Sequence, residues 1–304
     1  MCAKHRIPSL LLPAMGILLS ACAQSEPVVL PDGPGRVVAL ENPAIEEASG
    51  LAVSRVSADR LWLHNDSGGA ARLYAVDRQG RSLGEVDLPA LQNIDWEDMD
   101  AFVLDDSPML LIADVGDNSA QRPVVTLHWL EEPEPDQTTT AVTTSLHLRY
   151  PDGPRDCEAV AVDSGEAAIY LLTKRDQPPR LYRVPLAAHP LVATAEFVGT
   201  VNSIPEPTEQ DLLEDPAYGA NRSQPTAMSF AADGRRALVV TYKDAYLYER
   251  QDEESWLAAL NRAPRRIDLP QFPQTEAGGM RADGRTAYVA SEQLPAAMVE
   301  VTLP

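Results

Sequence analysis

The chain contains five copies of one short pattern, and this repeat limits its possible folds more than any other feature. Each copy opens with a hydroxyl or carboxylate residue, usually continues with a very small residue and alternating apolar positions, and often turns at Asp-Gly or Ser-Gly. The copies are SGLAVSR from Ser49, EDMDAFVLDD from Glu97, EAVAVDSGEA from Glu158, TAMSFAADGRRA from Thr226 and EAGGMRADGRTA from Glu276. Their starts lie 48 to 68 residues apart, and a repeat of this size with about four strands is typical of a β-propeller blade.

The ends of the repeat predict how the propeller closes. Second and third strand-like runs follow each copy, and the first four units also supply a fourth, such as SLGEVDL and TTSLHLRY. The fifth unit stops after three, and GRVVALE at residues 35–41 can complete it and remove the open edge. We therefore predict an all-β fold of five four-stranded blades. Six blades are an alternative, because residues 204–224, which we interpret as a long polar loop, leave room for another unit; a β-sandwich is the other.

The N-terminus has the features of an export signal. Lys4 and Arg6 precede an apolar run that ends in Leu-Ser-Ala-Cys at Cys22, and this arrangement resembles the bacterial lipoprotein signal. The resemblance implies a signal peptide at residues 1–21, a lipidated tether at 22–34 and the propeller at 35–304. Ala23, where an inner-membrane lipoprotein usually has Asp, implies the outer membrane, on its periplasmic or its outer side. The alternative is that Cys22 is an ordinary core cysteine.

Charge and cysteine content exclude several classes of function. The chain has 45 acidic and 25 basic residues and a net charge of −20, which argues against partners such as nucleic acid or anionic membrane surfaces. No segment after the signal has eighteen consecutive apolar residues, so we expect the domain to contact the membrane only through its lipid. We also expect the chain to be a monomer. Cys157 alone would remain in the mature domain without a lipid, and no intramolecular disulfide is expected.

The five repeat starts define a candidate metal site. The first strand of a propeller blade lies innermost, so the starts should meet around the central axis as a ring of three carboxylates and two hydroxyls: Ser49, Glu97, Glu158, Thr226 and Glu276. Carboxylates this close either take up protons or share a cation. Because every donor is a hard oxygen, we expect Ca²⁺ rather than zinc. The alternative is that these groups only face a water-filled channel.

The acids around Glu97 call for different interpretations. In the stretch DWEDMD, Asp95 precedes the strand and should lie on the same face as the ring. Asp98 and Asp100 fall within the strand and are expected to hold neighbouring blades or loops. Further along the chain, residues 252–263, DEESWLAALNRA, have the pattern of a short amphipathic helix that packs between strands.

The ring pattern and the motifs around it resemble a known family. The order Ser, Glu, Glu, hydroxyl, Glu, together with RLWLHNDSGGAARLYAVD, WEDM, LLIADVGDN, IYLLTKR and TEAGGM, is similar to the calcium-activated soluble apyrases. That resemblance implies a five-bladed propeller that hydrolyses nucleoside diphosphates around a channel calcium held by the five ring residues. Thr226 departs from the serine of the family but keeps the hydroxyl. HNDSGG, DWED and GDN also resemble uncharacterised secreted bacterial propellers that are loosely described as phytase-like.

The ends of the second strands supply candidate catalytic residues. Asp66 and Asp114 lie 17 positions after their ring residues, and Lys174, Tyr242 and Glu292 lie 16 after theirs, so all should share the ring face. Lys174, Arg175 and Lys243 could bind an anion, while Asp66 or Asp114 could orient or deprotonate water. The alternative is that these are solvated loop-tip charges and that GDN and NDSGG only form turns.

Two functions follow from this sequence. The first is a calcium-dependent hydrolase of phosphate or other anionic esters that acts outside the cytoplasm on a small anionic substrate. The second is a non-catalytic propeller whose ion is structural and whose rim binds a protein or glycan partner at the outer membrane. The charge cluster at the predicted mouth favours the first, and the lack of a recognisable catalytic triad favours the second.

Overall fold

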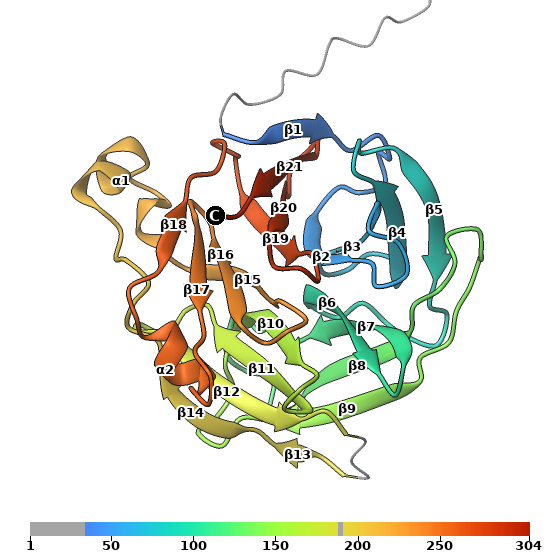
Figure 1. The fold of residues 1–304 in the computed structure, drawn as a ribbon, viewed down its shortest axis with the longest axis horizontal. Coiled ribbons are helices and arrows are strands. Elements are labelled where there is room, and N and C mark those ends of the chain that lie inside the picture. Colours follow the sequence, from blue (N-terminus) through green and yellow to red (C-terminus); the bar gives the residue numbers. More distant parts are fainter. Residues whose placement is uncertain (1–33, 188–190) are drawn as a thin grey trace, which may run out of the picture.

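The computed structural model describes residues 34–187 and 191–304, which form five antiparallel sheets arranged in a ring (Figure 1). The first blade contains β2 (Ala48–Val53), β3 (Arg60–Asn65), β4 (Arg72–Asp77) and β5 (Ser82–Asp87). The second contains β6 (Trp96–Leu104), β7 (Ser107–Asp114), β8 (Val125–Glu131) and β9 (Thr144–Arg149). The third contains β10 (Cys157–Asp163), β11 (Ala168–Thr173), β12 (Arg180–Pro185) and β14 (Glu196–Thr200).

The last two blades complete the ring. The fourth blade contains β15 (Pro225–Phe230), β16 (Arg236–Thr241), β17 (Ala245–Glu249) and β18 (Arg265–Ile267). The fifth contains β19 (Thr275–Met280), β20 (Thr286–Ser291), β21 (Ala297–Thr302) and, from the other end of the domain, β1 (Arg36–Ala39). β1 pairs antiparallel with β21 from Arg36 opposite Glu300 to Ala39 opposite Ala297. The predicted closure by residues 35–41, and the five-bladed all-β fold, are therefore confirmed.

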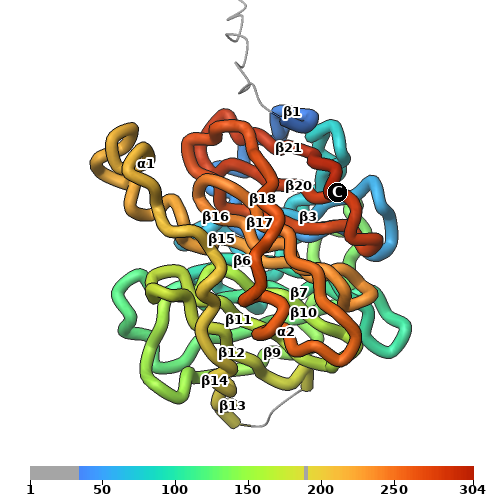
Figure 2. Tube along the Cα trace, turned by 60° about the vertical axis from the view of Figure 1, so that its left-hand side comes forward, coloured from blue at the N-terminus to red at the C-terminus, as the bar shows by residue number. Residues whose placement is uncertain are grey.

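The segment that could have formed a sixth blade has no strand. Residues 204–224 contain the helix α1 (Glu209–Glu214) and a short 3₁₀ turn, η1 (Gly219–Asn221), and α1 projects from the ring (Figure 2). The second blade has an additional edge strand that the sequence did not predict, β13 (Ala193–Thr194), which runs parallel to β9. The predicted helix at residues 252–263 is confirmed as α2 (Trp256–Leu260). Within the described residues, no helix has the length and apolar character needed to span a membrane.

The hydrophobic core lies between the blades. Each pair of neighbouring sheets encloses a cluster of buried apolar side chains; between the first and second blades, for example, Trp62 and Trp96 pack with Leu110 and Ile112. Because every innermost strand is covered by apolar layers on both sides, the five strands β2, β6, β10, β15 and β19 are fixed around the axis. The proposed signal peptide and Cys22 lie outside the described residues.

Candidate functional site

Each innermost strand has a β-bulge at its ring residue. In the first blade, Ala48 pairs with Asn65 and Gly50 pairs with His64, which leaves Ser49 out of the ladder. The other four inner strands break register at the same place and leave out Glu97, Glu158, Thr226 and Glu276. A bulge bends the strand and redirects the side chain of the extra residue. The sequence repeat thus aligned five structurally equivalent positions.

A cavity of about 140 Å³ lies at this ring and draws residues from all five blades. Its walls are formed by Ser49, Asp66, Glu97, Asn118, Glu158, Lys174, Arg175, Tyr242, Gln274, Glu276 and Glu292. Four of the five ring residues therefore line the cavity. The fifth, Thr226, is buried, and its hydroxyl Oγ1 has no hydrogen-bond partner within the described residues. The cavity is rich in acids and contains only two cationic side chains.

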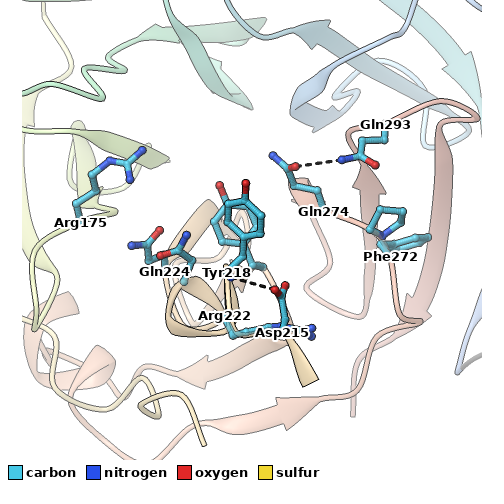
Figure 3. A pocket seen from close by; sticks show the side chains of 11 residues that line it. Arg175, Asp215, Tyr218, Arg222, Gln224, Phe272, Gln274 and Gln293 are labelled. Atoms are coloured by element: carbon cyan, nitrogen blue, oxygen red, sulfur yellow. Dashed lines mark hydrogen bonds between the residues drawn. The ribbon is translucent and has the colours of Figure 1, made fainter. Parts of the chain in front are cut away.

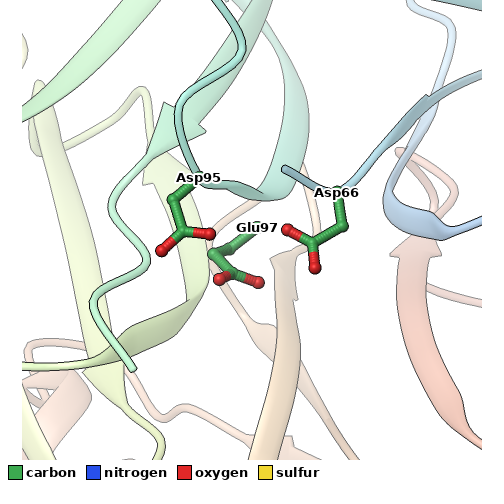
Figure 4. A group of neighbouring side chains, drawn as sticks. All are labelled: Asp66, Asp95 and Glu97. Atoms are coloured by element: carbon green, nitrogen blue, oxygen red, sulfur yellow. The ribbon is translucent and has the colours of Figure 1, made fainter. Parts of the chain in front are cut away.

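Two groups of carboxylates in and beside the cavity could bind a metal ion. The carboxylate oxygens of Asp66, Asp95 and Glu97 all lie within 4.8 Å of one another (Figure 4), and so do those of Glu97, Asp156 and Glu158. Glu97 belongs to both groups. Its hydroxyl neighbour Ser49 donates from Oγ to the Glu97 backbone carbonyl at 2.7 Å. Both groups are formed by residues of the first three blades, whereas Glu276 and Glu292 of the fifth blade line the cavity but belong to neither group.

Burial and mutual repulsion raise the pKa values of these acids. Glu97 and Glu158 are 5% and 3% exposed, and burial holds the pKa of each well above its usual value. The charge of Glu158 adds to the rise at Glu97, whereas at Glu158 the charge of Lys174 opposes the rise and that of Glu276 adds to it. Burial also raises the pKa of Asp66 to about 6 and that of Glu292 to about 7. A divalent cation would relieve the repulsion that raises them.

Lys174 neutralises part of this charge. Its Nζ forms an ion pair with Glu158 and lies 4.7 Å from the ring centroid of Tyr242. Burial alone would lower the pKa of Lys174, but the charges of Glu158 and Glu276 raise it, so the ammonium stays protonated. Lys174 therefore lies in the cavity as predicted, where its role in the structure is to hold a ring carboxylate.

Arg175 joins two blades at the rim. Its Nε donates to Asp156 Oδ2 at 2.5 Å, and its guanidinium also contacts the side chain of Asn118. The other oxygen of Asp156 accepts the backbone N–H of Asp117 at 2.9 Å. The Arg175 side chain is still 43% exposed, so one side of the guanidinium is available to a ligand.

Asp114 and Lys243, two other candidate residues, do not line the cavity. Asp114 forms an ion pair with Arg122 at 2.6 Å, and Lys243 forms one with Asp211 in the helix α1. Asp114 pairs with Trp96, the residue before the ring residue Glu97. In the first blade the corresponding pair is Asn65 with Ala48, so Asp114 is equivalent to Asn65 and not to Asp66. Asp66 and Asp114 both lie 17 residues after their ring residues, but they are not structurally equivalent, because the β6–β7 hairpin is longer than the others.

The backbone shows which residue takes that position in the second blade. Asp66, Lys174 and Glu292 each donate their backbone N–H to the carbonyl of the residue two before their ring residue, and in the second blade the donor is Gly116. A Cβ on Gly116 would lie 2.1 Å from Glu97 Oε1 and 2.6 Å from Asp95 Cγ. Gly116 thus leaves the space that the two carboxylates fill.

The residues two before the ring form a layer that the sequence analysis did not recognise as a set. They are Glu47, Asp95, Asp156, Gln224 and Gln274. Gln274 donates from Nε2 to Glu276 Oε1 at 2.8 Å, and Asp156 takes part in one of the carboxylate groups. All five are acids or amides, so the aligned repeat already contained the signal.

Asp98 and Asp100 hold blades together, as expected from their place within the strand. Asp98 is fully buried, and its Oδ2 accepts the backbone N–H of Val160 at 2.7 Å and of Met228 at 3.1 Å. Since Met228 belongs to the fourth blade, this carboxylate crosses the axis. Asp100 Oδ2 accepts the backbone N–H of Val162 at 2.8 Å. These two acids crosslink the inner strands below the cavity.

The comparisons with known proteins support no further assignment. No protein-family model and no curated protein matches the sequence. Similar solved structures include the PQQ-bound aldose sugar dehydrogenase from Streptomyces coelicolor (TM-score 0.45, 11% identity, 89% of this chain and 99% of that chain). A gluconolactonase from Xanthomonas campestris (0.47, 9%, 90% and 99%) and the Kuenenia stuttgartiensis hydrazine synthase (0.43, 10%, 84% and 83%) are also similar. None of these three is an apyrase, and the likenesses are too distant to inform the site.

Proposed function

We propose that the protein is a calcium-dependent hydrolase of phosphate or other anionic esters, with its reaction centre in the cavity at the ring. One observation carries the proposal: two groups of carboxylates share the buried Glu97 at the point where three blades converge. The donors are all oxygen atoms, which suits Ca²⁺. The resemblance of the ring to that of soluble apyrases points to the same chemistry.

The residues present fit a calcium ion. Glu97 and Glu158 would be its central ligands, with Asp66, Asp95 or Asp156 beside them. The predicted ring adds Glu276 and the hydroxyls of Ser49 and Thr226, and the Thr226 hydroxyl is buried without a partner within the described chain. When bound, the ion would polarise the scissile group of the ester.

The side chains around the ion position would handle the substrate and the proton. Asp66 has a pKa of about 6, so near neutral pH it is mostly ionised and can still accept a proton from water. Arg175 presents a partly exposed, planar guanidinium whose N–H groups can pair with two oxygens of a phosphate or carboxylate. Lys174 maintains the position of Glu158 through their ion pair.

The location of this activity is part of the proposal. We infer that Cys22 is lipidated and that the tether of residues 22–34 holds the propeller at the outer membrane. Labelled palmitate incorporated by the full-length chain and not by Cys22→Ala would support this, and equal labelling of both would contradict it.

A substrate panel tests the reaction. The chain from residue 24 would be assayed with nucleotides, phosphomonoesters and lactones, each with calcium and with chelator. Calcium-dependent turnover that Asp66→Asn abolishes and that the matched variant Asp283→Asn retains would support the proposal, since Asp283 lies on an exposed turn. Calcium binding without turnover of any substrate would instead indicate a propeller with a structural ion that binds a protein or glycan.

A further inference from the structure

A second, larger cavity adjoins the one at the ring. Its volume is about 490 Å³, within the range of small-molecule sites. It shares Arg175, Tyr242 and Gln274 with the ring cavity, so these three side chains lie between the two. Its outer wall comes from the segment between β14 and β15, which includes Tyr218 and Arg222 (Figure 3).

The segment that forms this wall is attached to itself and to the fourth blade by several contacts. Thr208 and Asp211 form a reciprocal cap at the start of α1, and Asp211 also pairs with Lys243. Gly219 packs so closely on α1 that a Cβ would lie 2.3 Å from the Asp211 carbonyl oxygen. Lys243, which we expected to bind an anion, therefore anchors the wall of the cavity. A preorganised wall can bind a ligand without first being ordered.

The lining includes one guanidinium without an ion pair and one amide oxygen without a hydrogen bond within the described chain. Arg222 makes no ion pair there, although Asp215 lines the same cavity. One oxygen of Asp215, Oδ1, accepts the backbone N–H groups of Ala217 and Tyr218. The amide oxygen of Gln224 is buried and has no hydrogen-bond partner. The cavity thus offers unused donors and acceptors to a polar ligand.

Aromatic and amide side chains complete the lining. Tyr218 is 69% exposed, and Phe272 and Tyr242 also face the cavity. An exposed aromatic face packs well against the apolar C–H face of a saturated ring. Gln224 Oε1 has no partner within the described residues and can accept from a ligand hydroxyl. Gln274 is already engaged, because its Nε2 donates to Glu276 and its Oε1 accepts from Gln293 Nε2 at 3.4 Å, so the carbonyl oxygen of Gln293 is the other amide acceptor at the cavity.

We propose that this cavity binds an anionic sugar, with Arg222 and Arg175 on its charged group, Tyr218 against its ring and the amides on its hydroxyls. A guanidinium binds carboxylate and phosphate through two parallel hydrogen bonds, so either anion fits. The inference deepens the proposed function, on which it rests for the idea that this sugar is part of the substrate. Binding itself requires neither calcium nor turnover.

The test measures binding without catalysis. Saturation-transfer NMR in chelator would compare D-glucuronate, glucose 6-phosphate, D-glucose and acetate with the chain from residue 24. We expect one or both anionic sugars to bind at least tenfold more tightly than glucose, and acetate not to bind. Preference for glucuronate or for the phosphate would assign the anion to a carboxylate or a phosphoester. Equal binding of glucose and both anionic sugars, or no binding, would overturn the proposal.

Variants link the binding to the cavity. Arg222→Gln should weaken the anionic sugars at least tenfold and leave glucose unchanged, and Tyr218→Ala should weaken all three sugars. The matched control is Arg235→Gln, because Arg235 pairs with Asp252 at an exposed turn of the fourth blade. Affinity unchanged in both cavity variants would overturn the proposal. Sugar binding without any ester hydrolysis would refute the proposed hydrolase alone, and hydrolysis without sugar binding would refute this inference alone.

Discussion

Two pairs of acids, Asp95 with Glu97 and Asp98 with Asp100, lie within six residues of each other at the start of β6 and have different surroundings. Asp98 and Asp100 accept backbone N–H groups from neighbouring blades. Asp95 and Glu97 instead face other carboxylates. Burial raises the pKa in both pairs, so the pKa alone does not separate them.

The difference lies in what surrounds each carboxylate. A buried acid whose oxygens accept several N–H groups is a structural crosslink. A buried acid that faces other acids is costly to the fold and persists where a cation or a proton offsets the repulsion. Glu97 has this second environment, and it is therefore a better candidate ligand than the more deeply buried Asp98.

The largest expected effect comes from removing the crosslink. Asp98→Ala would leave the N–H groups of Val160 and Met228 without acceptors, and we expect a loss of about 3–5 kcal/mol in the free energy of unfolding. Asp98→Asn keeps one carbonyl oxygen and should lose less. Glu97→Gln should change stability by less than about 1 kcal/mol without calcium, since it also removes repulsion. Urea denaturation in chelator measures all three. A smaller loss in Asp98→Ala than in Glu97→Gln would reverse the comparison.

Calcium should produce the next largest effect, and on the other pair. At a concentration 100 times its Kd, calcium should stabilise the chain by about 2.7 kcal/mol. Glu97→Gln should abolish the rise in Tm because Glu97 belongs to both carboxylate groups. Glu276→Gln should keep most of it, because Glu276 belongs to neither group and accepts a hydrogen bond from Gln274. If both variants lose the calcium-induced rise in Tm equally, the ion is bound by the whole ring of five residues. If millimolar calcium leaves the Tm of the wild-type chain unchanged, there is no metal site.

The fold could be predicted from the sequence because each blade has the same packing and strand requirements. Packing between blades requires the same apolar alternation and the same bulge five times, so the copies remain recognisable and the missing strand at one end identifies its partner at the other. The edge strand β13 has no counterpart in the other blades, and for that reason it was missed.

The site could be predicted only where it follows the repeat. Ser49, Glu97, Glu158 and Glu276 line the cavity, as do Asp66, Lys174 and Arg175. Asp114 and Lys243 do not line the cavity, because each pairs with a residue outside the repeat: Arg122 follows a longer hairpin, and Asp211 lies in the segment between two blades. A count along the chain does not contain such tertiary pairings.

The pH dependence of stability should separate the cavity acids from the rest of the chain. Asp66 and Glu292 have pKa values of about 6 and 7 in the fold, above those of the unfolded chain. The folded state therefore binds more protons, and their contribution to stability is complete below about pH 4 and is lost as the pH rises through 6 and 7. The double variant Asp66→Asn, Glu292→Gln should reduce this loss by about 1–2 kcal/mol in calcium-free protein. Urea unfolding at pH 4.5 and 7.5 measures it; parallel losses in both proteins would contradict the assignment.

The smallest expected effect on stability tests the geometry around Glu97 most directly. In Gly116→Ala the new Cβ would lie 2.1 Å from Glu97 Oε1, and the carboxylates of Glu97 and Asp95 must move apart. Since both are the ends of flexible side chains, we expect less than about 1 kcal/mol of lost stability. Calcium affinity should nevertheless fall about tenfold, or about 1.4 kcal/mol, because two ligands are displaced together. Gly69→Ala is the matched control, since a Cβ there meets open space. Calorimetric titration of both variants would measure the difference, and an unchanged affinity in Gly116→Ala would move the ion away from Glu97 and toward Asp156 and Glu158.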